Sequence, residues 1–274
     1  MRNRIFLILL LGAFARTGSA QRVSDTTAVI REFNEVMGFA VQPYLYYTSV
    51  TSLLTGPLMD RADTGALLHG VFYKNGDDLY YGNEQEESFW QDSLMININH
   101  RRKTIRVSKV DVASKKKMDL LPLKKMDAQK LLREHYTISR LPARGDTEYI
   151  VVRSQEGRQS LRIAGTEMLL SYTKKEHLPL LMQVTMRVRQ QETGGVTEAL
   201  RAKGFDVAKM TEEKEGAHFL VMDQTAAVRF NSIEMTKDKA LEMPSWKEKI
   251  SYDALQGSFS GKGECAGYEV VKTF

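Results

Sequence analysis

The chain of 274 residues contains a single cysteine, Cys265. One thiol excludes an internal disulfide, so the fold must be stabilised by its hydrophobic core. A nucleophilic cysteine needs a neighbouring base, and no histidine lies near Cys265 in the sequence. We therefore interpret Cys265 as a partly buried thiol without a catalytic role.

Recognisable catalytic motifs are also missing from the sequence. It has no Gly-x-Ser-x-Gly nucleophile elbow, no Gly-x-x-x-x-Gly-Lys-Ser/Thr phosphate loop and no dinucleotide-binding fingerprint. The five histidines are scattered, and none forms a pair with the spacing of a zinc site. We expect no enzymatic activity, no cofactor and no metal, and a secreted hydrolase is the least favoured of three hypotheses.

Without its N-terminal segment, the chain has no large excess of positive or negative charge. The formal net charge is +5, and three arginines in the first twenty residues reduce it to about +2 when that segment is removed. Nucleic-acid binding requires Lys and Arg gathered on one surface. The strongest basic run, residues 115–117, is interpreted as a solvated loop edge. We expect no nucleic-acid partner.

The N-terminus itself is informative. Two arginines precede an apolar run at residues 5–11, and small residues follow at 18–20. This pattern is typical of a secretory signal peptide, residues 1–20, cleaved after about Ala20. The apolar run is shorter than the roughly 20 residues that span a bilayer, and no cysteine follows it for lipid attachment. The mature chain is expected to be exported without a transmembrane segment, in the periplasm or, as the alternative, outside the cell.

Three segments have helical patterns. Residues 25–37 place apolar side chains at helical spacing, with Asp25 as the cap and Gly38 at the end. Residues 126–136 predict a short helix, and residues 197–203 predict another that ends at a glycine.

The rest of the chain predicts antiparallel β-structure. Asn75-Gly76 between two apolar stretches is a strong hairpin signal, and a second hairpin joins 93–99 to 104–110. Residues 182–188 alternate strictly between apolar and polar side chains. We therefore predict a mainly β fold, a curved antiparallel sheet that forms an open barrel, with helices covering its concave face. A single domain, residues 21–274, is expected, with a C-terminal strand and loop extension from about residue 250.

Aromatic residues and methionines gather in the predicted strands. Thioether side chains adapt to ligands of varied shape, so the two groups together suit acyl chains. The predicted ligand-binding residues are the inward members of each alternating strand. They are Val71, Tyr73, Leu79, Tyr81, Leu94, Ile96, Ile98, Ile105, Val107, Met182, Val184 and Met186.

The order of features in residues 71–81 and 87–107 resembles the LolA-type outer-membrane lipoprotein carriers. Residues 228–235, followed by the apolar stretch and proline of 240–244, are similar to that family's closing strand. The resemblance extends over about residues 25–250. It implies an unclosed antiparallel barrel, capped by helices, whose apolar interior receives acyl chains of lipids or lipoproteins.

Two main hypotheses follow for the function. The first is a non-catalytic periplasmic carrier or sensor that holds acyl chains in an apolar cleft. The second is an envelope scaffold or interaction protein that has the same fold, a filled interior and a protein partner.

Overall fold

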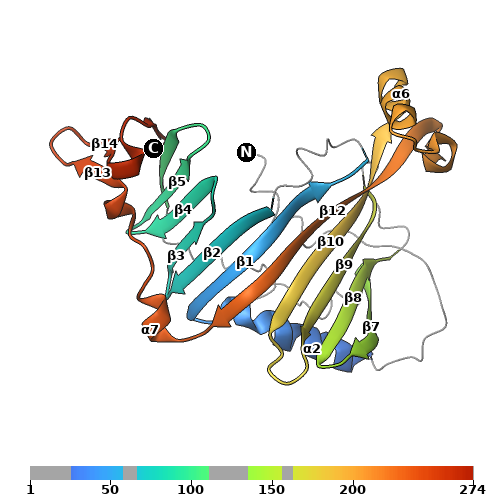
Figure 1. The fold of residues 1–274 in the computed structure, drawn as a ribbon, viewed down its shortest axis with the longest axis horizontal. Coiled ribbons are helices and arrows are strands. Elements are labelled where there is room, and N and C mark those ends of the chain that lie inside the picture. The colour runs from blue at the N-terminus through green and yellow to red at the C-terminus, as the bar shows by residue number, and fades with distance from the viewer. Residues whose placement is uncertain (1–25, 58–66, 111–134, 156–162, 274) are drawn as a thin grey trace. The chain divides into compact units, whose positions relative to one another are not determined.

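The computed structural model describes residues 26–57, 67–110, 135–155 and 163–273. These residues are mainly β-strand with few helices, and the large antiparallel sheet is not closed into a barrel within the described ranges (Figure 1). The predicted class, mainly β and unclosed, is confirmed.

The chain divides into two compact units. Unit 1 takes its described residues from 1–37, 51–67 and 125–229, and unit 2 takes its own from 38–50, 68–124 and 230–274. Each unit therefore combines stretches that are distant in the sequence. The expectation of one domain stays a prediction.

Some predictions concern residues outside the described ranges. They are the signal peptide, the Asp25 cap, the basic run at 115–117 and almost all of the helix predicted at 126–136. The last residue of that segment, Tyr136, begins a strand that the sequence did not predict. None of the helices in the described part of the chain has the length and hydrophobicity needed to cross a bilayer.

Unit 1 contains one long helix and most of the long strands. Its strand order is β12-β10-β9-β8-β7, with β11 paired to β12. The strand β1 (Tyr44–Thr55) passes from unit 2 into this unit, and most of β12 belongs here. The other elements are α2 (Thr26–Met37), β7 (Tyr136–Arg144), β8 (Thr147–Ser154), β9 (Ile163–Thr173), β10 (Pro179–Gln191), α6 (Gly194–Ala202), η3 (Val207–Met210), β11 (Thr211–Lys214) and β12 (Ala217–Glu234).

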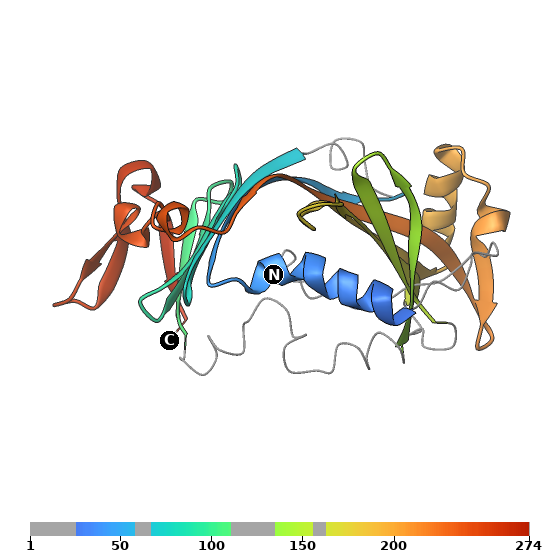
Figure 2. The same ribbon diagram turned by 90° about the horizontal axis from the view of Figure 1, so that it is seen from below.

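The helix α2 confirms the helix predicted at 25–37. It lies along one face of the strands of unit 1 (Figures 1 and 2), and its apolar side chains are buried there because they recur at helical spacing. The buried apolar residues are Val29, Ile30, Phe33, Val36 and Met37.

The alternation predicted for residues 182–188 is confirmed as far as Arg187, after which a register irregularity precedes the half-buried Val188. Met182, Val184 and Met186 are buried, whereas Arg187 is exposed and pairs with Asp223 on the other face. At the edge of the sheet, β7 contains Pro142 and a register irregularity. Because proline has no backbone N–H to donate to a further strand, it is tolerated in β7 at the edge of the sheet.

Unit 2 contains the shorter strands and the C-terminal segment, which we define as residues 236–273. Its strand order is β15-β6-β5-β4-β3-β2-β1, where β15 pairs parallel with β6 and the pairs from β2 to β6 are antiparallel. The elements are η1 (Gly38–Val41), β2 (Leu67–Asn75), β3 (Asp78–Gly82), β4 (Glu86–Gln91), β5 (Leu94–Asn99), β6 (Thr104–Lys109), α7 (Lys237–Ala240), η4 (Trp246–Glu248), β13 (Ile250–Asp253), β14 (Ser258–Gly261), η5 (Gly263–Cys265) and β15 (Glu269–Lys272).

Both predicted hairpins are present in unit 2. Gly76, in the turn between β2 and β3, has a φ of 61°, a conformation that glycine adopts without strain. The turn between β5 and β6 places Lys103 at a φ of 51°. The sequence located these turns because their chemistry is local.

Candidate functional site

The predicted ligand-binding residues of unit 2 lie on two different faces of its sheet. Tyr73 pairs directly with Tyr80, whereas Tyr81 pairs with Phe72 and Leu79 pairs with Lys74. Directly opposed residues share a face, and neighbours along a strand do not. Tyr81 and Leu79 therefore face away from Tyr73, and the single interior predicted from the sequence is wrong for unit 2.

The first face, which we call the isoleucine face, is occupied by the protein itself. Ile98 and Ile105 are paired and almost completely buried, and they pack in one cluster with Trp246 of the C-terminal segment. The buried members of the cluster are Tyr80, Phe89, Ile96, Ile98, Ile105, Val107, Trp246, Ile250 and Cys265. The partly buried residues packed against it are Val71, Tyr73, Leu94, Met243, Phe259, Tyr268 and Val270. Seven predicted ligand-binding residues thus belong to an internal core.

Cys265 is part of this core. It is fully buried, where the sequence suggested partial burial, and burial followed by the nearby Glu264 charge raises the pKa of its thiol. A methyl group at Gly261 would collide with the backbone carbonyl of Cys265. Glycine is needed there because the two backbones approach so closely.

The second face of unit 2, which we call the aromatic face, contains Leu79 and Tyr81. Leu79 pairs with Trp90, and Trp90 pairs with Met95. Leu79, Tyr81 and Trp90 are half-buried. The apolar residues that share this face are Phe72, Leu79, Tyr81, Trp90 and Met95.

The other three predicted residues lie together on unit 1, on what we call the methionine face. Val184 pairs with Met168 on one side and Ala226 on the other, and Met168 pairs with Val152. The apolar residues of this face are Ile138, Ile150, Val152, Met168, Leu170, Met182, Val184, Met186 and Ala226.

Polar contacts fasten α2 to the methionine face. Arg140, which shares the face through its pairing with Ile150, donates to Glu32 of the helix, with Nε at 3.1 Å. Burial opposes the charge of Glu32, but the hydrogen bond from Arg140 and the bond with Tyr172 outweigh it, so its pKa is lowered. A second ion pair joins Glu35 to His177 at 3.2 Å.

Two hydroxyl groups on the methionine face have no hydrogen-bond partner among the residues that the structure describes. Ser154 Oγ and Thr166 Oγ1 are both buried and unpaired. Thr166 pairs with Met186. The register of β8 and β9 pairs Arg153 with Glu167, and its continuation by one residue places Ser154 opposite Thr166. The two hydroxyls thus lie on a mainly apolar face that also holds Arg140 and Gln224, and folded proteins rarely leave a buried polar group unsatisfied.

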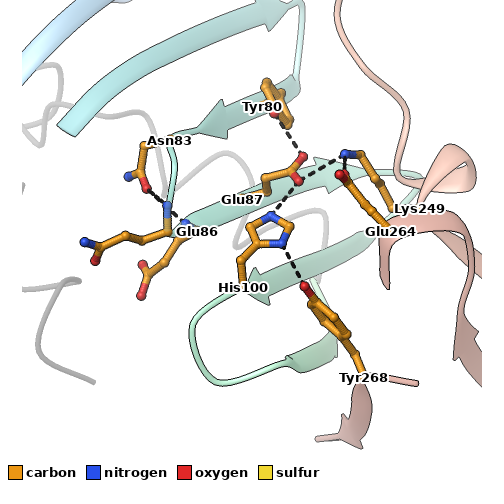
Figure 3. A network of polar contacts seen from close by, with 9 residues as sticks. Tyr80, Asn83, Glu86, Glu87, His100, Lys249, Glu264 and Tyr268 are labelled. Carbon is orange, nitrogen blue, oxygen red and sulfur yellow. Dashed lines mark hydrogen bonds and ion pairs between the residues drawn. The ribbon is translucent and has the colours of Figure 1, made fainter. Parts of the chain in front are cut away.

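A polar network on unit 2 joins the sheet to the C-terminal segment (Figure 3). The buried carboxylate of Glu87 accepts from Tyr80 Oη at 3.0 Å, from His100 Nε2 at 2.8 Å and from Lys249 Nζ at 3.2 Å. His100 Nδ1 and Tyr268 Oη are 3.2 Å apart. We call this group of five residues the Glu87 network.

The ionisation of the Glu87 network follows from these contacts. Burial, followed by the charge of Glu87, raises the pKa of Tyr80. Burial opposes the charge of Lys249, but its bonds to Glu264 and Glu87 prevail and raise its pKa. The bond from Lys249 lowers the pKa of Glu264. These groups hold complementary charges that bind the C-terminal segment to the sheet.

Four members of the Glu87 network, all but Tyr268, line an open groove of about 680 Å³ on unit 2. His69, which forms an exposed ion pair with Glu84 at 2.7 Å, lines another part of it. Glu87 already accepts three donors, so it acts as a fastening group and not as a free general base. In the described residues, no group of three or more His, Cys, Asp or Glu side chains is placed to hold a metal ion.

The sequence analysis does not predict the Glu87 network. One signal is present in the sequence, because strict alternation places Glu87 on the same side of β4 as the buried Phe89. Tyr80 comes from the neighbouring strand β3, but His100 comes from a turn and Lys249 from a segment about 160 residues away, which no local pattern indicates.

No protein-family model and no curated protein sequence matches the chain. Among solved structures, it is similar to an uncharacterised conserved protein from Thermus thermophilus, with a TM-score of 0.39 and 9% identity, over 90% of this chain and 99% of that one. It is similar to the structure of the MucA/MucB complex of Pseudomonas aeruginosa, with a TM-score of 0.38 and 10% identity, over 85% of this chain and 74% of that one. A LolA superfamily protein from Nitrosomonas europaea has a TM-score of 0.23 and 8% identity, over 79% of this chain and 100% of that one.

Proposed function

We propose that the protein is an exported, non-catalytic lipid-binding protein that holds an acyl chain between the methionine face and α2. The observation that carries this proposal is the pair of unpaired buried hydroxyls, Ser154 and Thr166, on an apolar surface. Two hydroxyl donors beside an apolar wall match the carbonyl group of an acyl ester or amide and the hydrocarbon attached to it.

The side chains of the methionine face support this ligand class. Met168, Met182 and Met186 are flexible and can repack around a chain of variable length or branching. Ala226, which pairs with Val184, has only a methyl side chain, so the protein's own side chains occupy less volume at that point of the face. Burial of each methylene contributes about 0.8 kcal/mol, so affinity should rise about fourfold per methylene.

The experiment is a titration of the purified mature protein with a fluorescent long-chain acyl ester. We expect saturable binding that unlabelled acyl esters displace in order of chain length. Absence of saturable binding would exclude the ligand role.

A double variant, Ser154→Ala with Thr166→Val, separates a ligand role from a structural one. Both changes replace an unpaired buried hydroxyl with an apolar group of similar shape, so stability should stay the same or rise. Binding of the probe should weaken about fivefold to tenfold, because the ligand carbonyl loses its donors. Thr185→Val, on the opposite face of β10, is the matched control and should bind normally.

A second candidate function is protein interaction in the envelope. It is favoured by the occupied isoleucine face and by the tip of the β13–β14 hairpin, where Leu255 is 99% exposed and Tyr252 is 53% exposed. Asp253 Oδ1 accepts from the backbone N–H of Leu255 at 2.9 Å and of Gln256 at 3.2 Å, which fixes the turn that displays the leucine.

The test of this alternative is purification from the native host under mild conditions. A stoichiometric protein partner that is lost with Leu255→Ser, and kept with Leu241→Ser, would favour it. Leu241 is the matched control because it is also exposed but lies outside the hairpin. A retained lipid without a protein partner would favour the lipid-binding proposal.

A further inference from the structure

The aromatic face of unit 2 has its own unpaired donors. Trp90 Nε1 and Asn97 Nδ2 are both buried without a hydrogen-bond partner. Trp90 is opposite Met95, and Asn97 is two residues beyond Met95 on the same face. Asn97 Oδ1 accepts from Ser88 Oγ at 3.0 Å, which leaves the amide nitrogen as the available donor. Two N–H groups beside an apolar surface therefore lack a hydrogen-bond acceptor among the described residues.

A cation stands beside these donors. Arg106 is exposed and stands directly opposite Asn97. Two carboxylates lie on the same face. Glu86 accepts from Asn99 Nδ2 at 2.8 Å, and Glu269 pairs with Thr104, two residues before Arg106.

We propose that the aromatic face binds an amphiphile with a carboxylate head. The carboxylate oxygens accept from Trp90 Nε1 and Asn97 Nδ2, Arg106 balances the negative charge, and the apolar body lies on Leu79 and Tyr81. A carboxylate fits better than a neutral carbonyl, because two oxygens match two donors and a guanidinium. Its ligand differs from the acyl ester or amide proposed for the methionine face in the charge of the head group.

The two tryptophans of the chain allow a direct test. Trp90 is on the aromatic face, and Trp246 is in the core on the isoleucine face. A long-chain carboxylic acid that is brominated on its acyl chain quenches tryptophan only at short range. We expect this acid, titrated below its micellar concentration, to quench wild-type fluorescence saturably. Trp90→Phe should lose that quenching, and Trp246→Phe should keep it.

The head group is tested with the methyl ester of the same brominated acid. Loss of a charge-assisted hydrogen bond weakens binding roughly tenfold or more, so the ester and the variant Arg106→Gln should both bind at least tenfold more weakly. Arg102→Gln, in the exposed turn between β5 and β6, removes the same charge elsewhere and should bind normally. Circular dichroism and the melting temperature establish that each variant is folded.

The outcomes decide the proposal. Equal quenching of wild type and Trp90→Phe, or equal affinity for acid and ester, overturns it. If Trp246→Phe does not fold, the difference between wild type and Trp90→Phe still reports Trp90. The double variant of Ser154 and Thr166 should leave the quenching of Trp90 unchanged, so failure at the methionine face and failure here are distinguishable.

Discussion

The isoleucine face of unit 2 and the methionine face of unit 1 are both apolar sheet surfaces, but they are covered differently. The isoleucine face is built from branched side chains and is closed by an irregular segment that contributes Trp246, Ile250 and Cys265. The methionine face is built from flexible side chains and is covered by a regular helix. On the methionine face the hydroxyls of Ser154 and Thr166 are buried without a partner among the described residues, and on the isoleucine face Trp246 Nε1 is likewise unpaired.

Two sheet faces that are similarly apolar can therefore have different roles, one as a core and the other as a binding surface. Branched and aromatic side chains in contact fill space in a fixed arrangement, which suits a core. Thioethers under a helix held by ion pairs allow repacking, which suits a ligand. The predictions below test whether the two faces differ in this way, and they begin with the largest effect.

Phe89→Ala should be the most destabilising change. Phe89 is completely buried on the isoleucine face and packs against Tyr80 with ring centroids 4.8 Å apart. Its loss leaves a large cavity in a core that cannot collapse, so the free energy of unfolding should fall by about 3–5 kcal/mol. Urea unfolding measures this. A loss below about 1 kcal/mol would mean that this core is as adaptable as the methionine face is proposed to be.

Glu87→Gln should have the next largest effect. It removes the charge that Lys249 and His100 bind, and it leaves their donors in a partly buried place, so stability should fall by about 1–3 kcal/mol. Glu84→Gln is the control, because its ion pair with His69 is exposed and should contribute less than about 1 kcal/mol. Equal effects of the two substitutions would contradict the role of the Glu87 network. Proteolysis near the C-terminus should also become faster in Glu87→Gln alone.

Acid should loosen α2 from the methionine face. The pKa of Glu32 is lowered in the folded protein, so its ionised form stabilises folding above its ordinary pKa of about 4.3. That contribution is lost as the pH falls through the lowered value. Unfolding free energies measured from neutral pH to about pH 3 should therefore fall less steeply in Glu32→Gln than in wild type. An identical slope would show that Glu32 does not fasten the helix.

The smallest effect should come from conservative changes within each face. Met186→Leu keeps the volume of an adaptable side chain and should cost well under about 1.5 kcal/mol. Ile98→Val removes one methylene from the fixed core and should cost about 0.5–1.5 kcal/mol. Thermal unfolding of the two variants compares them. If Met186→Leu proves the more costly, the methionine face is the more tightly packed of the two.

Much of the fold could be predicted from local patterns. The helix at 26–37 follows from apolar spacing, the turn at Asn75-Gly76 follows from its chemistry, and the two sides of β10 follow from strict alternation. The strand β7 was missed because it begins at Tyr136, inside a segment whose residues favour a helix.

The candidate sites could be predicted only in part. Alternation identified Met182, Val184 and Met186 as one side of a strand, and the structure places them on the methionine face. Alternation within one strand does not show which of its faces is shared with the next strand. The prediction therefore placed Leu79 and Tyr81 on the side of Tyr73. Register decides that relation, because a shift of one residue exchanges the two faces of a strand.

The sequence by itself determined the type of each element and its apolar side, since both depend on spacing within a few residues. The tertiary structure decided which apolar surface is closed by the chain's own residues and which donors remain unpaired. Trp246 packs in the same cluster as Ile98 although the two are far apart in the chain, and Lys249 and His100 reach the buried carboxylate of Glu87. These contacts depend on the packing of distant segments, which hydrophobic periodicity does not encode.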